Sequence, residues 1–382
     1  MNNLEFIGYL IVFFGVINIL RMTMLLVGSD IYTIKKHLRK NRNKKEYTPT
    51  FSIIIPAFEE EKTVLRAVQS VLASNYPKDK IQLIVVDDGS QDNTVAILEK
   101  FKQKKEIDNL IIVKQTRGGK AHGLNNGIKN YSTGELVMCL DADSYLDKNA
   151  LRNAVKYFED KNVAGLSSNV KIIPNDGLLN LIQRFEYIIC YQMKRAHTAM
   201  NIEYIIGGIG STFRRSVMEK INYYDTDTMT EDIDITMKII SNGNKKYKAI
   251  YGADVIAYTE ACLSISALLR QRYRWKYGRC QTFFKNKNMF FNGDKNHSKL
   301  LTYFYLPFAI YGDFAFIFEP LLLAYILFLA LSYHDLITLF SAFFVVTSYI
   351  SFNILAEDTL RIKDRIKLLS LAEEVPFLPH GM

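Results

Sequence analysis

Residues 51–56 read FSIIIP and residues 81–87 read IQLIVVD, and these two stretches decide the fold. Each is short and apolar and is rich in β-branched residues, which is typical of a buried strand. The segment between them, Glu61–Ala73, has the spacing of a helix and is followed by a break at Pro77. A strand, a helix and a second strand in this order predict an α/β fold with a parallel sheet.

The same alternation continues further along the chain. Leu110–Lys114 and Glu135–Leu140 are two more predicted strands, each preceded by a helical stretch. Polar residues gather where these strands end, and the carboxyl ends of parallel strands form the ligand crevice of an open α/β sheet. Beyond about residue 175 the pattern loosens into a long helical stretch, Gly177–Met200, then a glycine-rich turn, an acidic segment and another helix. We expect this second half to handle an acceptor.

Apolar residues crowd both ends of the chain. Leu4–Gly28 has only Glu5 and Arg21 as charged residues, and Leu336–Ala356 has none. Both lengths fit a membrane-spanning helix, which needs about 20 residues. A further candidate span covers about residues 314–333. We therefore predict transmembrane helices on both sides of an α/β domain.

The distribution of Lys and Arg predicts the orientation of these helices. Seven basic residues lie between positions 35 and 45, and four lie between 361 and 367. Because positive residues mark the cytoplasmic side, we expect a multi-pass protein of the cell membrane with a cytoplasmic catalytic domain. The predicted segments are an anchor at 1–34, a basic linker at 35–50, the catalytic domain at 51–260, interfacial helices at 261–300, a transmembrane hairpin at 301–360 and a cytoplasmic tail at 361–382.

The charge and the cysteines narrow the possible partners. The net charge is +9, but much of the excess lies beside the predicted spans, where membrane lipids with anionic headgroups are the natural partners. We therefore expect no nucleic-acid binding. The four cysteines show no CxxC or Cys/His spacing, so neither structural zinc nor a disulfide is expected in a cytosolic domain.

Two acidic motifs follow predicted strands. Asp87 and Asp88 end the strand at 81–87 and precede a Gly/Ser turn, a place from which a carboxylate can hold ribose or a base edge. The alternative is that they only cap the helix that follows. Asp141 and Asp143 follow the strand at 135–140, and two acids at this spacing can bind one divalent cation. A nucleotide-diphosphate leaving group needs such a cation, Mg²⁺ or Mn²⁺.

Two more motifs lie in the second half of the chain. Glu231 and Asp232 open a predicted helix, where an acid can be a general base or merely a favourable partner for the helix dipole. The segment QRYRW at 271–275 lies on a helix that leads toward the membrane spans. Its arginines can bind diphosphate and its indole can stack on a sugar, although the same residues suit a helix at a bilayer surface.

In this order, the four motifs resemble those of the processive family 2 glycosyltransferases, which include the cellulose, chitin, hyaluronan and poly-N-acetylglucosamine synthases. The resemblance covers about residues 51–280 and extends to the motif TED at 230–232 and to QRYRW. It implies a GT-A (Rossmann-like) domain. The short chain, with one anchor before that domain and few helices after it, is most similar to bacterial poly-N-acetylglucosamine synthases.

The resemblance also implies a role for each motif residue. Asp232 would be the catalytic base, and Asp143 with Asp141 would hold the metal. The donor nucleotide would meet the first set of residues, which is Ala57, Phe58, Glu59, Asp88, Lys120 and Asp141. The acceptor and the diphosphate would meet the second set, which is Gly208, Ser211, Glu231, Gln271, Arg272, Arg274 and Trp275.

The sequence thus predicts an inverting enzyme that polymerises a UDP-sugar, UDP-N-acetylglucosamine or UDP-glucose, into a β-linked polysaccharide. The alternative is a non-processive transferase that adds one sugar to a lipid or lipid-linked acceptor. A catalytically inactive nucleotide-sugar-binding subunit is disfavoured because every acidic motif position is present, and a transporter because the spans contain few charges. The chain ends soon after its last predicted span, which suggests an accessory subunit or self-association for export of the polymer.

Overall fold

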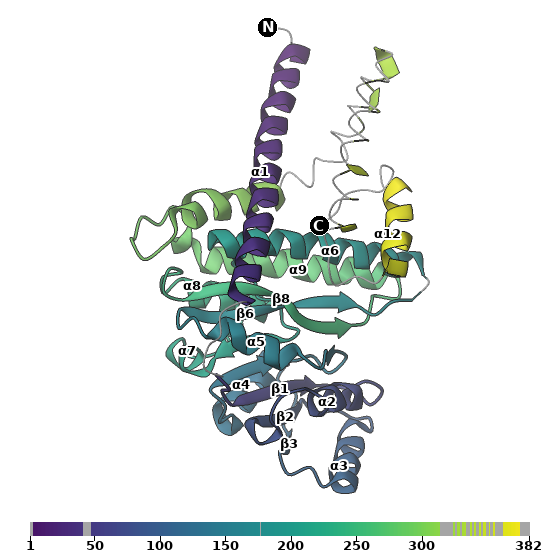
Figure 1. Ribbon diagram of the computed structural model, residues 1–382, viewed down its shortest axis with the longest axis vertical. Coiled ribbons are helices and arrows are strands. Elements are labelled where there is room, and N and C mark those ends of the chain that lie inside the picture. Colours follow the sequence, from purple (N-terminus) through teal and green to yellow (C-terminus); the bar gives the residue numbers. More distant parts are fainter. Residues whose placement is uncertain are drawn as a thin grey trace.

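The computed structural model describes residues 3–40, 47–175, 177–313 and 362–374, with scattered positions between 324 and 355. In this part of the chain, one mixed sheet has the strand order β3-β2-β1-β4-β7-β6-β8-β5. The strands are β1 Phe51–Ala57, β2 Ile81–Asp87, β3 Leu110–Lys114, β4 Leu136–Cys139, β5 Tyr145–Leu146, β6 Val163–Ile172, β7 Ser211–Arg214 and β8 Lys248–Thr259. The sheet has helices on both faces (Figure 1).

The α-helices include a long first helix and several short ones that connect strands. Their bounds are α1 Asn3–Lys40, α2 Val64–Leu72, α3 Thr94–Lys105, α4 Lys120–Asn126, α5 Ala150–Phe158, α6 Leu178–Met200, α7 Arg215–Lys220, α8 Glu231–Ile240, α9 Ile265–Lys285 and α12 Ile362–Glu374. Short 3₁₀ segments lie at Lys78–Lys80 and Lys287–Met289, and π-helical segments lie at Gly127–Tyr131 and Leu300–Tyr305.

The first four predicted strands are confirmed. β1 pairs in parallel with β2 and β4, and β2 pairs in parallel with β3. Successive side chains of β1 point to opposite faces, as strand geometry requires. Ile53 and Ile55 pack with α2 and α5 on one face, whereas Ile54 packs with α4, α7 and α8 on the other.

The expectation of a parallel sheet holds only in part for the other half, where β6 pairs in parallel with β8 but three pairings are antiparallel. β7 runs antiparallel to both β4 and β6, and β5 runs antiparallel to β8. Sequence patterns missed β6 because its buried run contains Ser168 and Asn169, which interrupt the apolar signal. These polar side chains form hydrogen bonds inside the fold, since Ser168 Oγ donates to the Ile209 carbonyl and Asn169 Nδ2 donates to the Ala253 carbonyl.

The C-terminal part of α1 is bound to the catalytic domain. Ser29 Oγ donates to Gln192 Oε1 on α6 at 3.0 Å, and Tyr32 OH donates to the Tyr251 carbonyl on β8 at 2.9 Å. A Cβ added at Gly28 would lie 2.9 Å from Ala196 Cβ, so the two helices cross at small residues. From this contact α1 extends away from the sheet, past the layer in which α6 and α9 lie side by side (Figure 1).

Among the described residues, no helix is both long and apolar enough to cross a membrane. The spans predicted at about 314–333 and at 336–356 fall largely outside the described residues, as do 41–46 of the basic linker. The predicted anchor lies within α1, many of whose side chains are also outside the described set. The transmembrane segments, like the domain boundaries, stay predictions.

Candidate functional site

The chain topology brings four loops to one edge of the sheet. β1, β2 and β4 are parallel neighbours, so the residues that follow them emerge together. β7 runs in the opposite direction, and its first residue, Ser211, pairs with Cys139, near the end of β4. The loop before β7, which contains Gly208, therefore meets the loop after β4, which contains Asp141.

A cluster of opposite charges occupies this meeting point. Lys120 Nζ, at the start of α4, lies 2.6 Å from Asp141 Oδ1 and 3.1 Å from Glu231 Oε1, at the start of α8. The backbone N–H of Gly208 donates to Asp232 Oδ2 at 3.0 Å. The structure thus brings together five of the predicted site residues: Lys120, Asp141, Gly208, Glu231 and Asp232. We call these five residues the central cluster.

The surroundings of the cluster shift its acid–base equilibria. Burial, followed by the charge of Glu231, raises the pKa of Asp232 to about 6, although Lys120 opposes the change. Burial alone lowers the pKa of Lys120, but Asp141 and Glu231 outweigh it and raise that pKa well above the usual value. At neutral pH Asp232 is therefore mostly ionised. Its pKa lies close to the value that suits a general base.

The Asp141/Asp143 pair has the chemistry of a divalent-cation site. Burial and the charge of Asp141 raise the pKa of Asp143, so the folded chain holds two carboxylates at an electrostatic cost that a cation would relieve. Asp143 accepts a hydrogen bond from Ser144 Oγ at 2.8 Å. Carboxylate oxygens are the ligands that Mg²⁺ and Mn²⁺ prefer, so the residues fit the predicted metal.

Arg66 fixes the backbone of the same pair, and the sequence analysis missed it. Its Nη2 donates to the Asp143 carbonyl at 2.8 Å and to Glu260 Oε1 at 2.8 Å. The guanidinium also lies over the Tyr145 ring, 5.3 Å from its centroid. Arg66 belongs to α2 and Glu260 follows β8, so no local sequence pattern connects either residue with Asp143.

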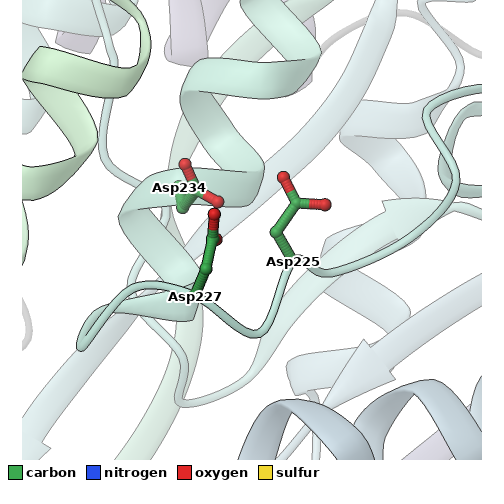
Figure 2. Close-up of side chains that lie close together, drawn as sticks. All are labelled: Asp225, Asp227 and Asp234. Carbon is green, nitrogen blue, oxygen red and sulfur yellow. The ribbon is translucent and has the colours of Figure 1, made fainter.

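Another acidic group has the spacing of metal ligands. The carboxylates of Asp225, Asp227 and Asp234 converge, as Figure 2 shows. Lys285 Nζ lies 2.6 Å from Asp225, 2.7 Å from Asp227 and 2.9 Å from Asp234. Because an ammonium group already pairs with all three carboxylates, we interpret this group as an ion-pair network that joins α9 to α8.

The predicted nucleotide residues surround the loop that leads into α4. Asp88 is 5% exposed, and its carboxylate accepts hydrogen bonds from Gln115 Nε2 and from the backbone N–H groups of Gly118 and Gly119, at 2.7–2.8 Å. In this structure Asp88 therefore positions the loop that carries Lys120.

The residues after β1 border the same loop. The Phe58 ring packs against the guanidinium of Arg117, with Cζ 3.9 Å from the ring centroid. Ala57 is buried at the end of β1. Glu59 has a left-handed φ of 56°, and its N–H donates to Ser90 Oγ. This geometry connects the β1 and β2 ends, and the nucleotide role of these residues stays a prediction.

The QRYRW residues lie on α9, as expected of a helix. Arg272 forms an ion pair with Glu186 on α6 and lies 4.2 Å from the Trp275 ring centroid. Gln271 Oε1 accepts from Cys262 Sγ and from Arg272, and Arg274 is exposed. Gln271 and Arg272 thus lie at the contact between α6 and α9. None of the hydrogen bonds or ion pairs described for these two residues reaches the central cluster.

The backbone of α9 nevertheless lies directly against the start of α8. A Cβ added at Gly278 would lie 2.5 Å from Thr230 Oγ1, so only glycine allows this approach. Gln281 Oε1, one turn further along α9, accepts from the Met229 N–H at 3.0 Å. The position of α9 therefore determines where Glu231 and Asp232 stand.

Comparison with known proteins identifies the family of the domain. Residues 52–222 match the family model described as Glycosyl transferase family 2. Poly-beta-1,6-N-acetyl-D-glucosamine synthase of Staphylococcus aureus (strain COL) is 30% identical over 262 residues, and that of Staphylococcus epidermidis is 31% identical over 260 residues. Each match covers 66% of this chain and 61% of the relative, so the chain spans about three fifths of the length of these proteins.

A solved structure supports the fold. The mannosyltransferase from Pyrobaculum calidifontis, in complex with GDP-Man and Mn²⁺, superposes with a TM-score of 0.58 at 20% identity. The superposition covers 93% of this chain and 98% of that one. At this identity the likeness shows a shared fold. This chain therefore carries a family 2 glycosyltransferase domain with an α/β, GT-A-like fold.

Proposed function

We propose that the chain is a membrane-bound, inverting glycosyltransferase that polymerises UDP-N-acetylglucosamine into a β-linked polysaccharide. The observation that carries the proposal is the central cluster, in which Asp232 lies beside the backbone of Gly208 and opposite Asp141. In this proposal the Asp232 carboxylate, as the base, lies between the donor site at Asp141 and the loop that contains Gly208. The names of the poly-N-acetylglucosamine synthases among the relatives support the choice of sugar.

In this mechanism Asp232 takes the proton from the attacking hydroxyl of the acceptor sugar. Its raised pKa suits that task, and the hydrogen bond from the Gly208 N–H fixes the position of one carboxylate oxygen. Asp141 and Asp143 would hold Mg²⁺ or Mn²⁺, which supplies charge stabilisation for the departing diphosphate. Trp275, on α9, offers an aromatic face to the acceptor. The glycosidic bond forms as the bond to the diphosphate breaks on the opposite side of the anomeric carbon.

A direct test would incubate membranes that contain the full chain with radiolabelled UDP-N-acetylglucosamine or UDP-glucose and with Mg²⁺ or Mn²⁺. The released UDP and the product length would be measured together. We expect long product from UDP-N-acetylglucosamine and none from Asp143→Ala. Asp108→Ala replaces an exposed acid of the α3–β3 loop and is the matched control, with unchanged product.

Each contrary outcome points to a different error. UDP release with a product of one added sugar would favour the non-processive transferase. Full activity of Asp143→Ala with an unchanged metal requirement would refute the metal assignment. Absence of transfer from either donor by the wild-type chain would refute the proposed function.

The membrane placement is also a proposal, and the charge asymmetry of the sequence supports it. We propose a multi-pass protein with the α/β domain in the cytoplasm. Extraction of membranes with alkaline carbonate should leave the chain in the pellet, and a protease added outside intact cells should spare the α/β domain. Release of the chain into the supernatant would contradict the placement.

A further inference from the structure

Lys120 lies where two functions of the proposed site overlap. Its ammonium contacts Asp141, a proposed metal ligand, and Glu231, the neighbour of the proposed base. Four carboxylates belong to this region, those of Asp141, Asp143, Glu231 and Asp232, and Lys120 is the basic residue that pairs with two of them.

The loop before Lys120 directs its side chain toward Asp141 and Glu231. Gly119 has φ 92°, a conformation that favours glycine, and it immediately precedes Lys120. The carboxylate of Asp88 accepts from the N–H groups of Gly118 and Gly119 and so fixes this turn. On the opposite side, a Cβ at Gly208 would lie 3.0 Å from Nζ, so the absence of a side chain there leaves the space that the ammonium occupies.

An ammonium and a divalent cation compete for the same oxygen of Asp141. Lys120 Nζ lies 2.6 Å from Asp141 Oδ1, whereas Mg²⁺ binds carboxylate oxygens at about 2.0–2.1 Å. Two cations at those distances from one oxygen would repel each other strongly. Binding of the metal through this oxygen is therefore favoured when Lys120 moves away.

Lys120 has both the freedom to move and a natural second partner. Its side chain is 36% exposed, unlike the buried strand residues beside it, and a lysine side chain has four rotatable carbon–carbon bonds. The diphosphate of a nucleotide-sugar is an anion that would stand at the same sheet edge, and lysine is a common ligand of phosphate groups. Transfer of the ammonium from Asp141 to the diphosphate would leave Asp141 open to the metal.

We propose that Lys120 is a placeholder cation that makes metal binding and nucleotide binding depend on each other. In the empty site it neutralises Asp141 and Glu231, and on donor binding it moves to the diphosphate while the divalent cation takes its place at Asp141. The inference rests on the proposed function, because it assumes a metal and a nucleotide diphosphate at this edge. It adds that neither ligand alone reaches its full affinity.

The test measures Mn²⁺ binding to the full chain by electron paramagnetic resonance, with and without saturating UDP, in wild type and Lys120→Met. Without UDP, we expect Lys120→Met to bind Mn²⁺ at least about tenfold more tightly, within the usual range of coupling between sites. With UDP, we expect the gain to fall to about twofold or less, because UDP has already displaced Lys120 in the wild type.

Two further variants separate this effect from others. Lys120→Gln also removes the charge and should reproduce the result if Lys120→Met folds poorly. Lys114→Met removes a surface lysine that pairs with Glu99 on α3, and it should bind Mn²⁺ like the wild type in both conditions. Because coupling is reciprocal, the same factor should appear when UDP affinity is measured with and without Mn²⁺.

The outcomes distinguish the inference from the function on which it rests. Equal tightening of Mn²⁺ binding with and without UDP would mean that Lys120 only repels the metal, and it would overturn the placeholder role alone. No tightening in either condition would overturn that role as well. A wild-type chain that binds neither Mn²⁺ nor UDP would overturn the proposed function and the inference together.

Discussion

Gly208→Ala should disturb the central cluster without disturbing the fold. The new Cβ would lie 3.0 Å from Lys120 Nζ, whereas ordinary van der Waals contacts begin at 3.4 Å. The ammonium must therefore retreat by roughly half an ångström. Since a misplacement of about 1 Å in an active site can lower the rate about a hundredfold, we expect turnover to fall by about tenfold. Nζ is the end of a flexible chain, so the stability of the protein should change little.

Gly207→Ala is the matched control, because a Cβ at that position would have no neighbour within 4 Å. Turnover would be followed as UDP release from UDP-N-acetylglucosamine, and thermal unfolding would be measured on the same preparations. We expect wild-type turnover from Gly207→Ala and equal unfolding temperatures for both variants. Full activity of Gly208→Ala, or an equal loss in Gly207→Ala, would refute the reasoning.

Two further substitutions test the base and the contact between α8 and α9. Asp232→Asn should lower turnover at least about a hundredfold while UDP still binds. The wild-type kcat/KM should fall as the pH drops through about 6, because a protonated carboxylate cannot accept a proton. A wild-type profile flat from pH 8 to pH 5 would contradict the assignment. Gly278→Ala forces a Cβ to within 2.5 Å of Thr230 Oγ1. It should lower the free energy of unfolding by about 1–3 kcal/mol, measured by thermal unfolding, and should also lower turnover. Gly312→Ala, whose Cβ meets nothing within 4 Å, should change neither property, and equal behaviour of the two variants would exclude a tight contact at Thr230.

The sequence predicted the parallel half of the sheet because its strands are uninterrupted apolar runs. The run at 81–87 and the strand at Leu110–Lys114 match the observed bounds of β2 and β3. β6 was missed for the opposite reason, since it buries Ser168 and Asn169, each of which donates a long-range hydrogen bond. Such partners are defined only once the chain has folded, and no local pattern reports them.

The candidate site could be predicted as a set of residues but not as a set of contacts. Asp141 and Asp232 belong to recognisable motifs, and Lys120 contacts a residue of each motif, Asp141 and Glu231. The pairing of Arg272 with Glu186 could not be foreseen, because it depends on how α6 and α9 pack. Gly278 carries no chemical signal at all, and its importance appears only from its approach to Thr230.

The reversal of strand direction at β7 explains why one site can join a donor with an acceptor. In a fully parallel sheet, the loop before a strand lies at the edge opposite the loops that follow its neighbours. Because β7 is antiparallel to β4, the loop before it, with Gly208, reaches the edge where Asp141 follows β4. The Gly208 N–H then holds Asp232, and Lys120 connects Asp141 with Glu231. The antiparallel strand that the sequence pattern failed to predict is therefore the feature that brings the predicted residues together.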